Sequence, residues 1–251
     1  MVRTIELKKH FKDGKSGTKK AVDGVSFEAH PGRIFGLLGV NGAGKTTTLR
    51  MLSTVIQPSA GKAEVAGFDV VQHPEKVRAN IGFMSNSTAL YARLTVREVV
   101  EYFGGLYGLE GAKLKERIEY VFDKMQLHEF GDRLCDKLST GQKQRTNIAR
   151  TILHDPPVLF FDEPTAGLDV VMSQAVMEFI EEARDSGKTV IFSTHIMSEV
   201  ERLCDDVAVI HDGVIRGRGT VPQLKDQTGE QTLEKAFLKL VEFKSGAAVM
   251  S

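Results

Sequence analysis

A glycine-rich stretch closed by a lysine and two threonines occupies residues 39–47, which read GVNGAGKTT. Closely spaced glycines let the backbone curl so that successive N–H groups face one anion. The lysine of such a loop can reach the β- and γ-phosphates of a nucleotide, and the next hydroxyl can ligate Mg²⁺. The candidate nucleotide-binding residues of this loop are Gly39, Val40, Asn41, Gly42, Ala43, Gly44, Lys45, Thr46 and Thr47.

The segments on either side of the loop have the character that a phosphate site needs. Residues 33–38 are mostly apolar and predict a buried strand, and residues 46–52 contain helix formers and no proline. A strand, a glycine loop and a helix in this order form the context in which the pattern binds phosphate, because the helix adds its positive N-terminal end. A chance match is the alternative, and the flanking elements count against it.

Two adjacent acids end a second apolar stretch, VLFFDE at residues 158–163. Asp162 suits the binding of Mg²⁺, directly or through a water molecule. Glu163 suits polarising a water for in-line attack on a γ-phosphate. The alternative is an exposed strand end with two solvated carboxylates.

His195 follows an apolar strand predicted at residues 190–193. At the carboxyl end of a parallel strand it would face a ligand crevice. A neutral imidazole in that position can hydrogen-bond a γ-phosphate or hold the attacking water. The remaining histidines are expected to be exposed or satisfied by ordinary packing: His10, His30, His73, His128, His154 and His211.

A serine motif precedes the helix predicted at residues 143–153. Ser139 and the N–H groups at the start of that helix can form a second anion site, separate from the glycine loop. Ser139 is expected to cap this helix in either case, and capping alone, without a bound phosphate, is the alternative. The motif consists of Leu138, Ser139, Thr140, Gly141 and Gln142.

The rest of the chain alternates between short strands and helical stretches. A helical pattern extends from about residue 93 to 152, and residues 170–183 carry one apolar helical face. Such alternation implies a parallel sheet flanked by helices. Strands are predicted at 2–11, 21–29, 63–66, 81–84, 158–161, 190–193 and 207–211, and a last amphipathic helix by Leu233, Phe237, Leu240 and Val241.

Composition excludes some classes of function. Lys and Arg total 33, as do Asp and Glu, so the formal net charge of +0 argues against a nucleic-acid-binding surface. Cys135 and Cys204 have no metal-ligand spacing and are expected to be core residues in a reducing compartment. The first dozen residues lack a signal-peptide apolar stretch, and no long apolar run is present. We therefore expect other chains to supply any membrane part.

The ordered motifs, together with Ala166-Gly167-Leu168-Asp169, resemble the ATP-binding subunit of ABC transporters over roughly residues 2–220. The resemblance implies an α/β fold with a P-loop NTPase (RecA-like) core and its parallel sheet. It also implies an N-terminal antiparallel β subdomain and an α-helical subdomain inserted at about 90–152. Residues 221–251 would form a C-terminal extension with the short amphipathic helix.

In that family two copies close around two ATP molecules with Mg²⁺, and the serine motif of one copy covers the ATP of the other. Asp169 would lie in the loop that links the two sites. Phe11 matches the aromatic residue on which the adenine stacks, with an ordinary core phenylalanine as the alternative. Two residues depart from the family pattern. Thr140 replaces a glycine, and Asn86 replaces a metal-contacting glutamine, so its contact with Mg²⁺ would be lost or bridged by water.

The resemblance implies an ATPase that drives a transmembrane permease from the cytoplasmic face of the membrane. The chain is similar to exporter subunits of the drug-efflux and sodium-efflux branch, with sodium as the expected cargo and a drug, lipid or polysaccharide as alternatives.

Residues 86–103 are the candidate docking surface, with ordinary packing as the alternative. An ABC-type ATPase that acts away from membranes is a further alternative, disfavoured by the single cassette and neutral charge. A switch with little turnover is disfavoured by Glu163 and His195. The docking residues would be Leu90, Tyr91, Arg93, Leu94, Val96 and Arg97.

Overall fold

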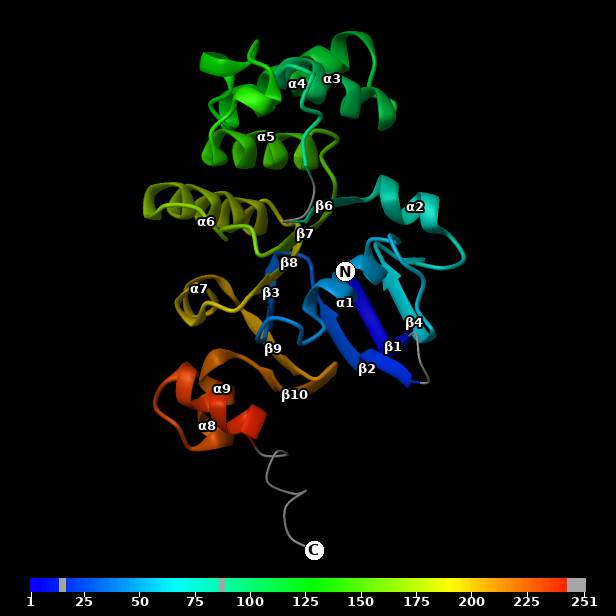
Figure 1. Ribbon diagram of the computed structural model, residues 1–251, viewed down its shortest axis with the longest axis vertical. Helices are drawn as coiled ribbons and strands as arrows, with labels where there is room; N and C mark the ends of the chain where they lie inside the picture. The colour runs from blue at the N-terminus through cyan, green and yellow to red at the C-terminus, as the bar shows by residue number, and fades with distance from the viewer. Residues whose placement is uncertain (14–16, 86–88, 243–251) are drawn as a thin grey trace, which may run out of the picture.

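A six-stranded sheet forms the centre of the molecule (Figure 1). The computed structural model describes residues 1–13, 17–85 and 89–242. Strands β6, β7, β8, β3 and β9 are parallel, and β10 pairs antiparallel with β9. From one edge to the other, the strands are β10 (Val214–Gly219), β9 (Asp206–His211), β3 (Arg33–Leu38), β8 (Thr189–Thr194), β7 (Val158–Asp162) and β6 (Ile81–Ser85).

The inner strands β7 and β8 are buried along their whole length, because their side chains pack into one apolar cluster on each face of the sheet. This explains why their sequences read as continuous apolar runs and not as an alternating pattern. In the register, Leu38 pairs with Thr194 and Asp162 pairs with Ser193. The carboxyl ends of β3, β7 and β8 therefore meet at one edge of the sheet.

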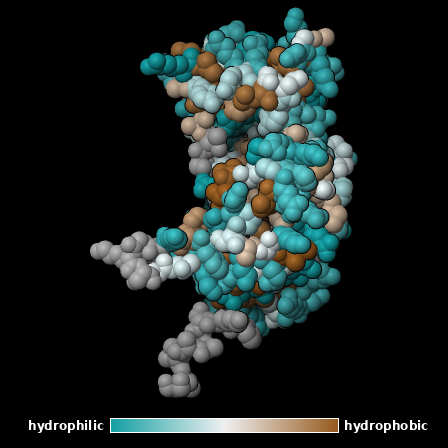
Figure 2. Space-filling view, turned by 90° about the vertical axis from the view of Figure 1, so that its right-hand side faces the viewer, coloured by the Kyte–Doolittle hydropathy of each residue, from teal (hydrophilic) through white to brown (hydrophobic). Residues whose placement is uncertain are grey.

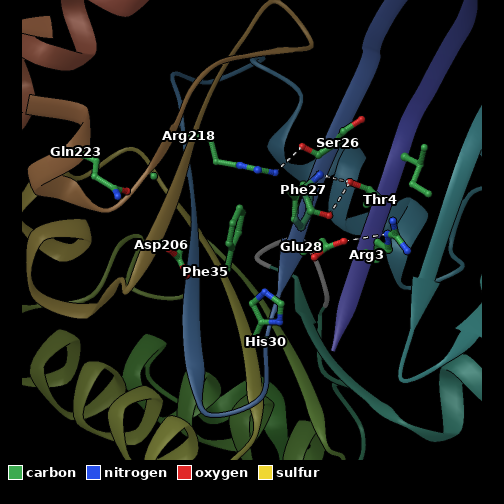
Figure 3. A pocket seen from close by; sticks show the side chains of 12 residues that line it. Arg3, Thr4, Ser26, Phe27, Glu28, His30, Phe35, Asp206, Arg218 and Gln223 are labelled. Atoms are coloured by element: carbon green, nitrogen blue, oxygen red, sulfur yellow. Dashed lines mark hydrogen bonds and ion pairs between the residues drawn. The ribbon is translucent and has the colours of Figure 1, made fainter. Parts of the chain in front are cut away.

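A smaller antiparallel sheet lies beside the first one, in the strand order β2-β1-β4-β5. Phe27 stacks on Phe35 across the junction, with ring centroids 4.6 Å apart. Figure 3 shows this junction, where Arg218 donates to the carbonyl of Ser26 at 3.4 Å. A pocket of about 620 Å³ opens here. Its lining includes Asp206 at the start of β9, so the pocket lies away from the carboxyl ends of the strands. The strands are β1 (Val2–Asp13), β2 (Gly17–Ala29), β4 (Ala60–Val65) and β5 (Phe68–Asp69).

Three longer helices gather at one end of the molecule, at the top of Figure 1. They are α3 (Val96–Leu106), α4 (Gly111–Lys124) and α5 (Thr140–Ile152), with short 3-10 turns at His128–Phe130 and Cys135–Lys137. A reciprocal capping box of Thr95 and Glu98 starts α3. The predicted fold class, with its parallel core sheet, antiparallel sheet and helical insertion, is confirmed. The predicted domain boundaries stay a prediction.

The other helices cover the central sheet and its lower end. A cluster of buried apolar residues joins α8 and α9 to β9 through Val209, Leu224 and Phe237. Burial raises the pKa of the Cys135 and Cys204 thiols, in keeping with ordinary core cysteines. These helices are α1 (Lys45–Leu52), α2 (Pro74–Ala79), α6 (Val170–Asp185), α7 (Met197–Leu203), α8 (Val221–Thr228) and α9 (Leu233–Glu242).

Sequence patterns located the long elements and missed several short ones. The strands β5 and β10 and the helices α2 and α8 were not predicted, whereas α7 lies in the helical stretch expected between the strands at 190–193 and 207–211. Strand β5 has only two residues, and β10 reads VIRGRG, so neither shows the apolar run that marks a buried strand. Strand β2 begins at Gly17 instead of residue 21, because its first residues are polar and exposed.

His154 is part of the packing between the helical region and the sheet, and it gives a testable pH dependence. Its ring stacks on Tyr107 with centroids 3.5 Å apart, and its Nε2 lies 3.0 Å from the carbonyl oxygen of Ile81. Nδ1 is buried and has no hydrogen-bond partner among the described residues. Burial lowers the pKa of His154 from 6.5 to about 4.

Because the unfolded chain binds this proton more readily, His154 stabilises the fold above pH 6.5 and that stability is lost as the pH falls toward 4. As the pH falls through this range, the free energy of unfolding should decrease less for the His154→Phe variant than for the wild type. The difference between the two decreases should reach up to roughly 3 kcal/mol. Urea unfolding at pH 7 and pH 4.5 measures the difference. Parallel pH dependences of the two proteins would contradict this account.

Candidate active site

The candidate site forms where β3, β7 and β8 end. Residues 39–44 connect β3 to α1, and Glu163 and His195 directly follow β7 and β8. The structure therefore brings together three groups that are far apart in the sequence. Parallel strands place the chemistry of such folds at this edge, because all of their carboxyl ends open toward it.

The glycine loop has the backbone geometry of an anion cradle. Gly42 and Gly44 have φ angles of 84° and 112°, which non-glycine residues rarely adopt. A Cβ atom on Gly44 would lie 2.6 Å from the carbonyl oxygen of Ala21, so β2 also restricts this position to glycine. In the part of the chain that the structure describes, no side chain caps the start of α1. The first N–H groups of a helix have no partner within the helix, so those of α1 can bind an anion.

Lys45 is held at the centre of the site and is only 4% exposed. Its Nζ donates to the carbonyl oxygens of Gly39 at 2.6 Å and Val40 at 3.3 Å, and it lies 3.2 Å from Oε1 of Glu163. The loop carbonyls thus hold the ammonium close to Glu163, the residue that follows β7. A buried cation in this position can bind phosphate oxygens strongly, because the surroundings screen its charge poorly.

Asp162 gathers two hydroxyl groups from different segments. Its Oδ1 accepts a hydrogen bond from Thr46 at 3.1 Å and from Ser193 at 2.6 Å. Asp162 is 3% exposed, so these bonds stabilise a carboxylate that would otherwise be costly to bury. The geometry brings Thr46 and Asp162 together, as the sequence predicted. Ser193 was not predicted as a site residue. The feature that could have indicated it is a hydroxyl group at the polar end of an apolar strand.

Glu163 lies between Lys45 and His195. Its Oε1 is 3.2 Å from Nζ of Lys45 and 3.3 Å from Nδ1 of His195. The backbone of Glu163 has a φ of 50°, a strained value for a residue with a side chain. Two bonds from its N–H hold that conformation, to the carbonyl oxygen of Ser193 at 3.0 Å and to its Oγ at 3.2 Å. His195 remains 46% exposed, so it can reach a ligand from the solvent side.

The serine motif lies at the start of α5 in the helical region. Ser139 and Gln142 form a capping box, with Gln142 N–H to Ser139 Oγ at 3.2 Å and Ser139 N–H to Gln142 Oε1 at 3.0 Å. Capping is therefore confirmed, and both Ser139 and Gln142 face solvent partly or fully. Within the described residues, no hydrogen bond or ion pair joins the motif to the glycine loop of the same chain.

The Asp169 loop lies close to the serine motif. A Cβ atom on Gly141 would lie 3.2 Å from the side chain of Met172 in α6. Asp169 caps α6 by accepting from the N–H of Met172 at 2.9 Å. The two residues that follow, Val170 and Val171, are 85% and 77% exposed. This apolar pair is open to solvent next to the loop that the family resemblance assigns to the contact between copies.

Two further predicted residues have different outcomes. Phe11 lies on β1 and is 40% exposed, so it is not an ordinary core phenylalanine. The Lys9 ammonium lies 5.2 Å from its ring centroid. Asn86, the candidate metal contact after β6, lies outside the described residues.

Sequence reasoning also missed Gln144, which lies two residues beyond the serine motif. Its Nε2 donates to the carbonyl oxygen of Pro164, the residue after Glu163. The same amide lies 3.8 Å from the sulfur of Met84 in β6. Gln144 therefore joins the helix that starts at the serine motif to the turn that carries Glu163. A polar residue on the inner face of a helix was the available signal.

Comparison with known proteins assigns the family. The model of the ABC transporter family matches residues 22–166. A shorter stretch, residues 135–201, matches a model described as an AAA domain, putative AbiEii toxin, Type IV TA system. The ABC transporter ATP-binding protein NatA of Bacillus subtilis (strain 168) is 40% identical, covering 96% of this chain and 98% of that protein. The linearmycin resistance ATP-binding protein LnrL of the same organism is 34% identical, covering 93% of this chain and 73% of that protein.

Solved structures agree with this assignment. An ATP-binding subunit of an ABC transporter has a TM-score of 0.85 and 27% identity, covering 95% of this chain and 98% of that chain. A bacterial ABC transporter cassette, described as dimeric, has a TM-score of 0.79 and 25% identity, covering 88% and 98%. The matching sequences, the shared fold and the site at the carboxyl edge of the sheet lead to one conclusion. This chain belongs to the ABC transporter family, as one of its ATPase subunits.

Proposed function

We propose that the chain binds ATP in the glycine loop, with Lys45 on the β- and γ-phosphates and Glu163 as the base that activates water. The observation that carries the proposal is that Lys45 and His195 both approach the carboxylate of Glu163. Oε1 of Glu163 lies 3.2 Å from Nζ of Lys45 and 3.3 Å from Nδ1 of His195. The carboxylate accepts a proton from the attacking water as the γ-phosphate bond breaks. His195 holds the γ-phosphate or the water, and the exposed ring of Phe11 stacks on the adenine.

The residues present fit a magnesium ion bound together with the nucleotide. In residues 1–13, 17–85 and 89–242, no group of three or more His, Cys, Asp or Glu side chains could hold a metal ion alone. Mg²⁺ in nucleotide sites uses one or two protein oxygens plus phosphate oxygens and water. The Thr46 hydroxyl and Asp162 supply such oxygens, 3.1 Å apart. When bound, the ion neutralises the charge that develops on the phosphates.

The active form in this proposal is a head-to-tail dimer of two copies. The serine motif and the glycine loop are separate in one chain, so a second copy is needed to bring them together around ATP. Residues Leu138–Gln142 then act on the nucleotide of the partner, and Asp169 links the two sites. The exposed pair Val170 and Val171 would be buried in this contact, which gives it an apolar component.

The membrane partner is a permease that docks on the helical region. None of the helices in the described ranges is both long and apolar enough to cross a bilayer. A groove of about 880 Å³ runs between α3 and the sheet, lined by Phe83, Phe103, Leu106 and Tyr107 among others. Leu106 is 63% exposed, and the ring of Tyr91, which is 51% exposed, lies 6.4 Å from the ring of Phe103. Figure 2 shows hydrophobic residues at the junction between the upper helical region and the body.

An exporter is the transport system that we infer, with its ATPase acting from the inner face of the membrane. Relatives include NatA and the linearmycin resistance protein LnrL. We propose sodium as the cargo and keep a drug, lipid or polysaccharide as the alternative. A strain that lacks this chain should accumulate sodium, whereas normal sodium levels with sensitivity to a drug would favour the alternative.

The dimer can be tested through the exposed valine pair. We expect the Val170→Asp, Val171→Asp double variant to bind ATP like the wild type and to lose at least tenfold in ATPase activity, because charges in an apolar contact disfavour association. Sedimentation with ATP should show monomers only. Val55→Asp is the control, since Val55 is 61% exposed on another surface. Full activity of the double variant would contradict the proposed interface.

A further inference from the structure

A buried carboxylate that the proposed mechanism does not use lies behind the active site. Glu199 belongs to α7 and is 6% exposed. Its Oε1 accepts a hydrogen bond from the Thr165 hydroxyl and its Oε2 accepts one from the Thr194 hydroxyl, each at 2.6 Å. Both threonines are also buried, at 5% and 2% exposure. We call these three residues the Glu199 bridge.

The bridge joins the two turns that carry the candidate catalytic residues. Thr165 lies two residues after Glu163, in the turn that leads to the Asp169 loop. Thr194 directly precedes His195. The Thr194 hydroxyl also accepts from the N–H of Ile196 at 3.0 Å, so it closes a tight turn around His195. One side chain therefore fixes both segments relative to each other.

The chemistry of this carboxylate suits a positioning role. A buried charge is costly unless hydrogen bonds or a cation compensate it. Among the described residues, no Lys, Arg or His forms an ion pair with Glu199, so the two hydroxyl donors are its compensating groups. Its neighbours Val200 and Leu203 are buried and apolar. The hydroxyl groups of the two turns thus fix the position of the carboxylate, and the same two hydrogen bonds fix the turns relative to α7.

We propose that Glu199 is a positioning residue that holds His195 at a fixed position relative to Glu163 and the Asp169 loop. This inference rests on the catalytic roles proposed above for Glu163 and His195. The carboxylate supplies an acceptor to each turn. Contact of a second copy with the Asp169 loop would then reach His195 through Thr165, Glu199 and Thr194.

The Glu199→Gln variant keeps the shape of the side chain and removes one acceptor. Its amide oxygen can still accept from one hydroxyl, but its NH₂ group cannot accept from the other. We expect the kcat of the ATPase to fall about tenfold, with the Kd of ATP unchanged, since no residue of the bridge belongs to the glycine loop. Glu201→Gln, on the exposed side of α7, should match the wild type.

A second pair of variants tests the same proposal if Glu199→Gln does not fold. Thr165→Val removes one hydroxyl at nearly constant volume, and Thr165→Ser restores a hydroxyl. We expect Thr165→Val to lose kcat to a similar degree as Glu199→Gln and Thr165→Ser to recover most of it. Equal kcat values for Thr165→Val and Thr165→Ser would overturn the proposal.

Combination with His195→Ala distinguishes positioning from general destabilisation. If Glu199 acts through His195, Glu199→Gln should cause little further loss in the His195→Ala background, measured by single-turnover hydrolysis with excess protein. The same tenfold loss in both backgrounds, or an unchanged kcat in Glu199→Gln alone, would overturn the proposal. An unchanged kcat in His195→Ala would instead refute the catalytic role of His195 itself.

Discussion

Replacement of Glu163 by Gln is expected to lower the ATPase kcat by at least about 100-fold, because general base catalysis typically contributes that much. The amide cannot accept the proton of the attacking water. It retains the shape of the side chain and one oxygen at the position 3.2 Å from Lys45, so ATP should still bind. If hydrolysis separates the proposed dimers, ATP-loaded dimers of this variant should persist. Steady-state phosphate release and size-exclusion chromatography with ATP measure the two effects.

The matched control for Glu163→Gln is Glu64→Gln, an exposed acid on β4. It makes the same chemical change away from the site and should leave both measurements at wild-type values. Phosphate release by Glu163→Gln at the wild-type rate would remove Glu163 as the base. Monomers at saturating ATP, observed also beside the membrane partner, would count against the dimer.

Replacement of Lys45 by Ala is expected to weaken ATP binding by about 100-fold. A charge-assisted contact to phosphate contributes up to roughly 3 kcal/mol, and each 1.4 kcal/mol corresponds to a tenfold change in Kd. The loss should be larger for ATP than for AMP, since the contacts proposed for Lys45 are with the outer phosphates. Titration with a fluorescent nucleotide measures both constants.

Lys45 is 4% exposed and bonds to the carbonyl of Gly39, so its loss could also alter the loop. A thermal melt of Lys45→Ala separates this effect from lost affinity, and Lys62→Ala on the exposed side of β4 is the control. Wild-type affinity for ATP in a folded Lys45→Ala protein would refute the assignment of residues 39–47 as the phosphate site.

Local patterns were sufficient for the long elements and for the loop. Buried parallel strands read as apolar runs, and the positions of β3, β7, β8 and β9 followed from those runs. The capping of α5 by Ser139 was also visible, because a capping box involves residues three apart. The elements β5, β10, α2 and α8 were not predicted, since their formation depends on packing against the rest of the fold.

The assignment of chemical roles to Lys45, Asp162, Glu163 and His195 needed only the sequence, since residue type and place at a strand end carry that information. The contacts among them were decided by the tertiary structure. The pairing of Asp162 with Ser193 across β7 and β8 brings the acid to a hydroxyl 31 positions away in the chain. The Glu199 bridge arises in the same way, since α7 returns to the sheet edge behind His195. Strand register and helix packing are sums of many weak contacts between distant segments, and no local pattern records them.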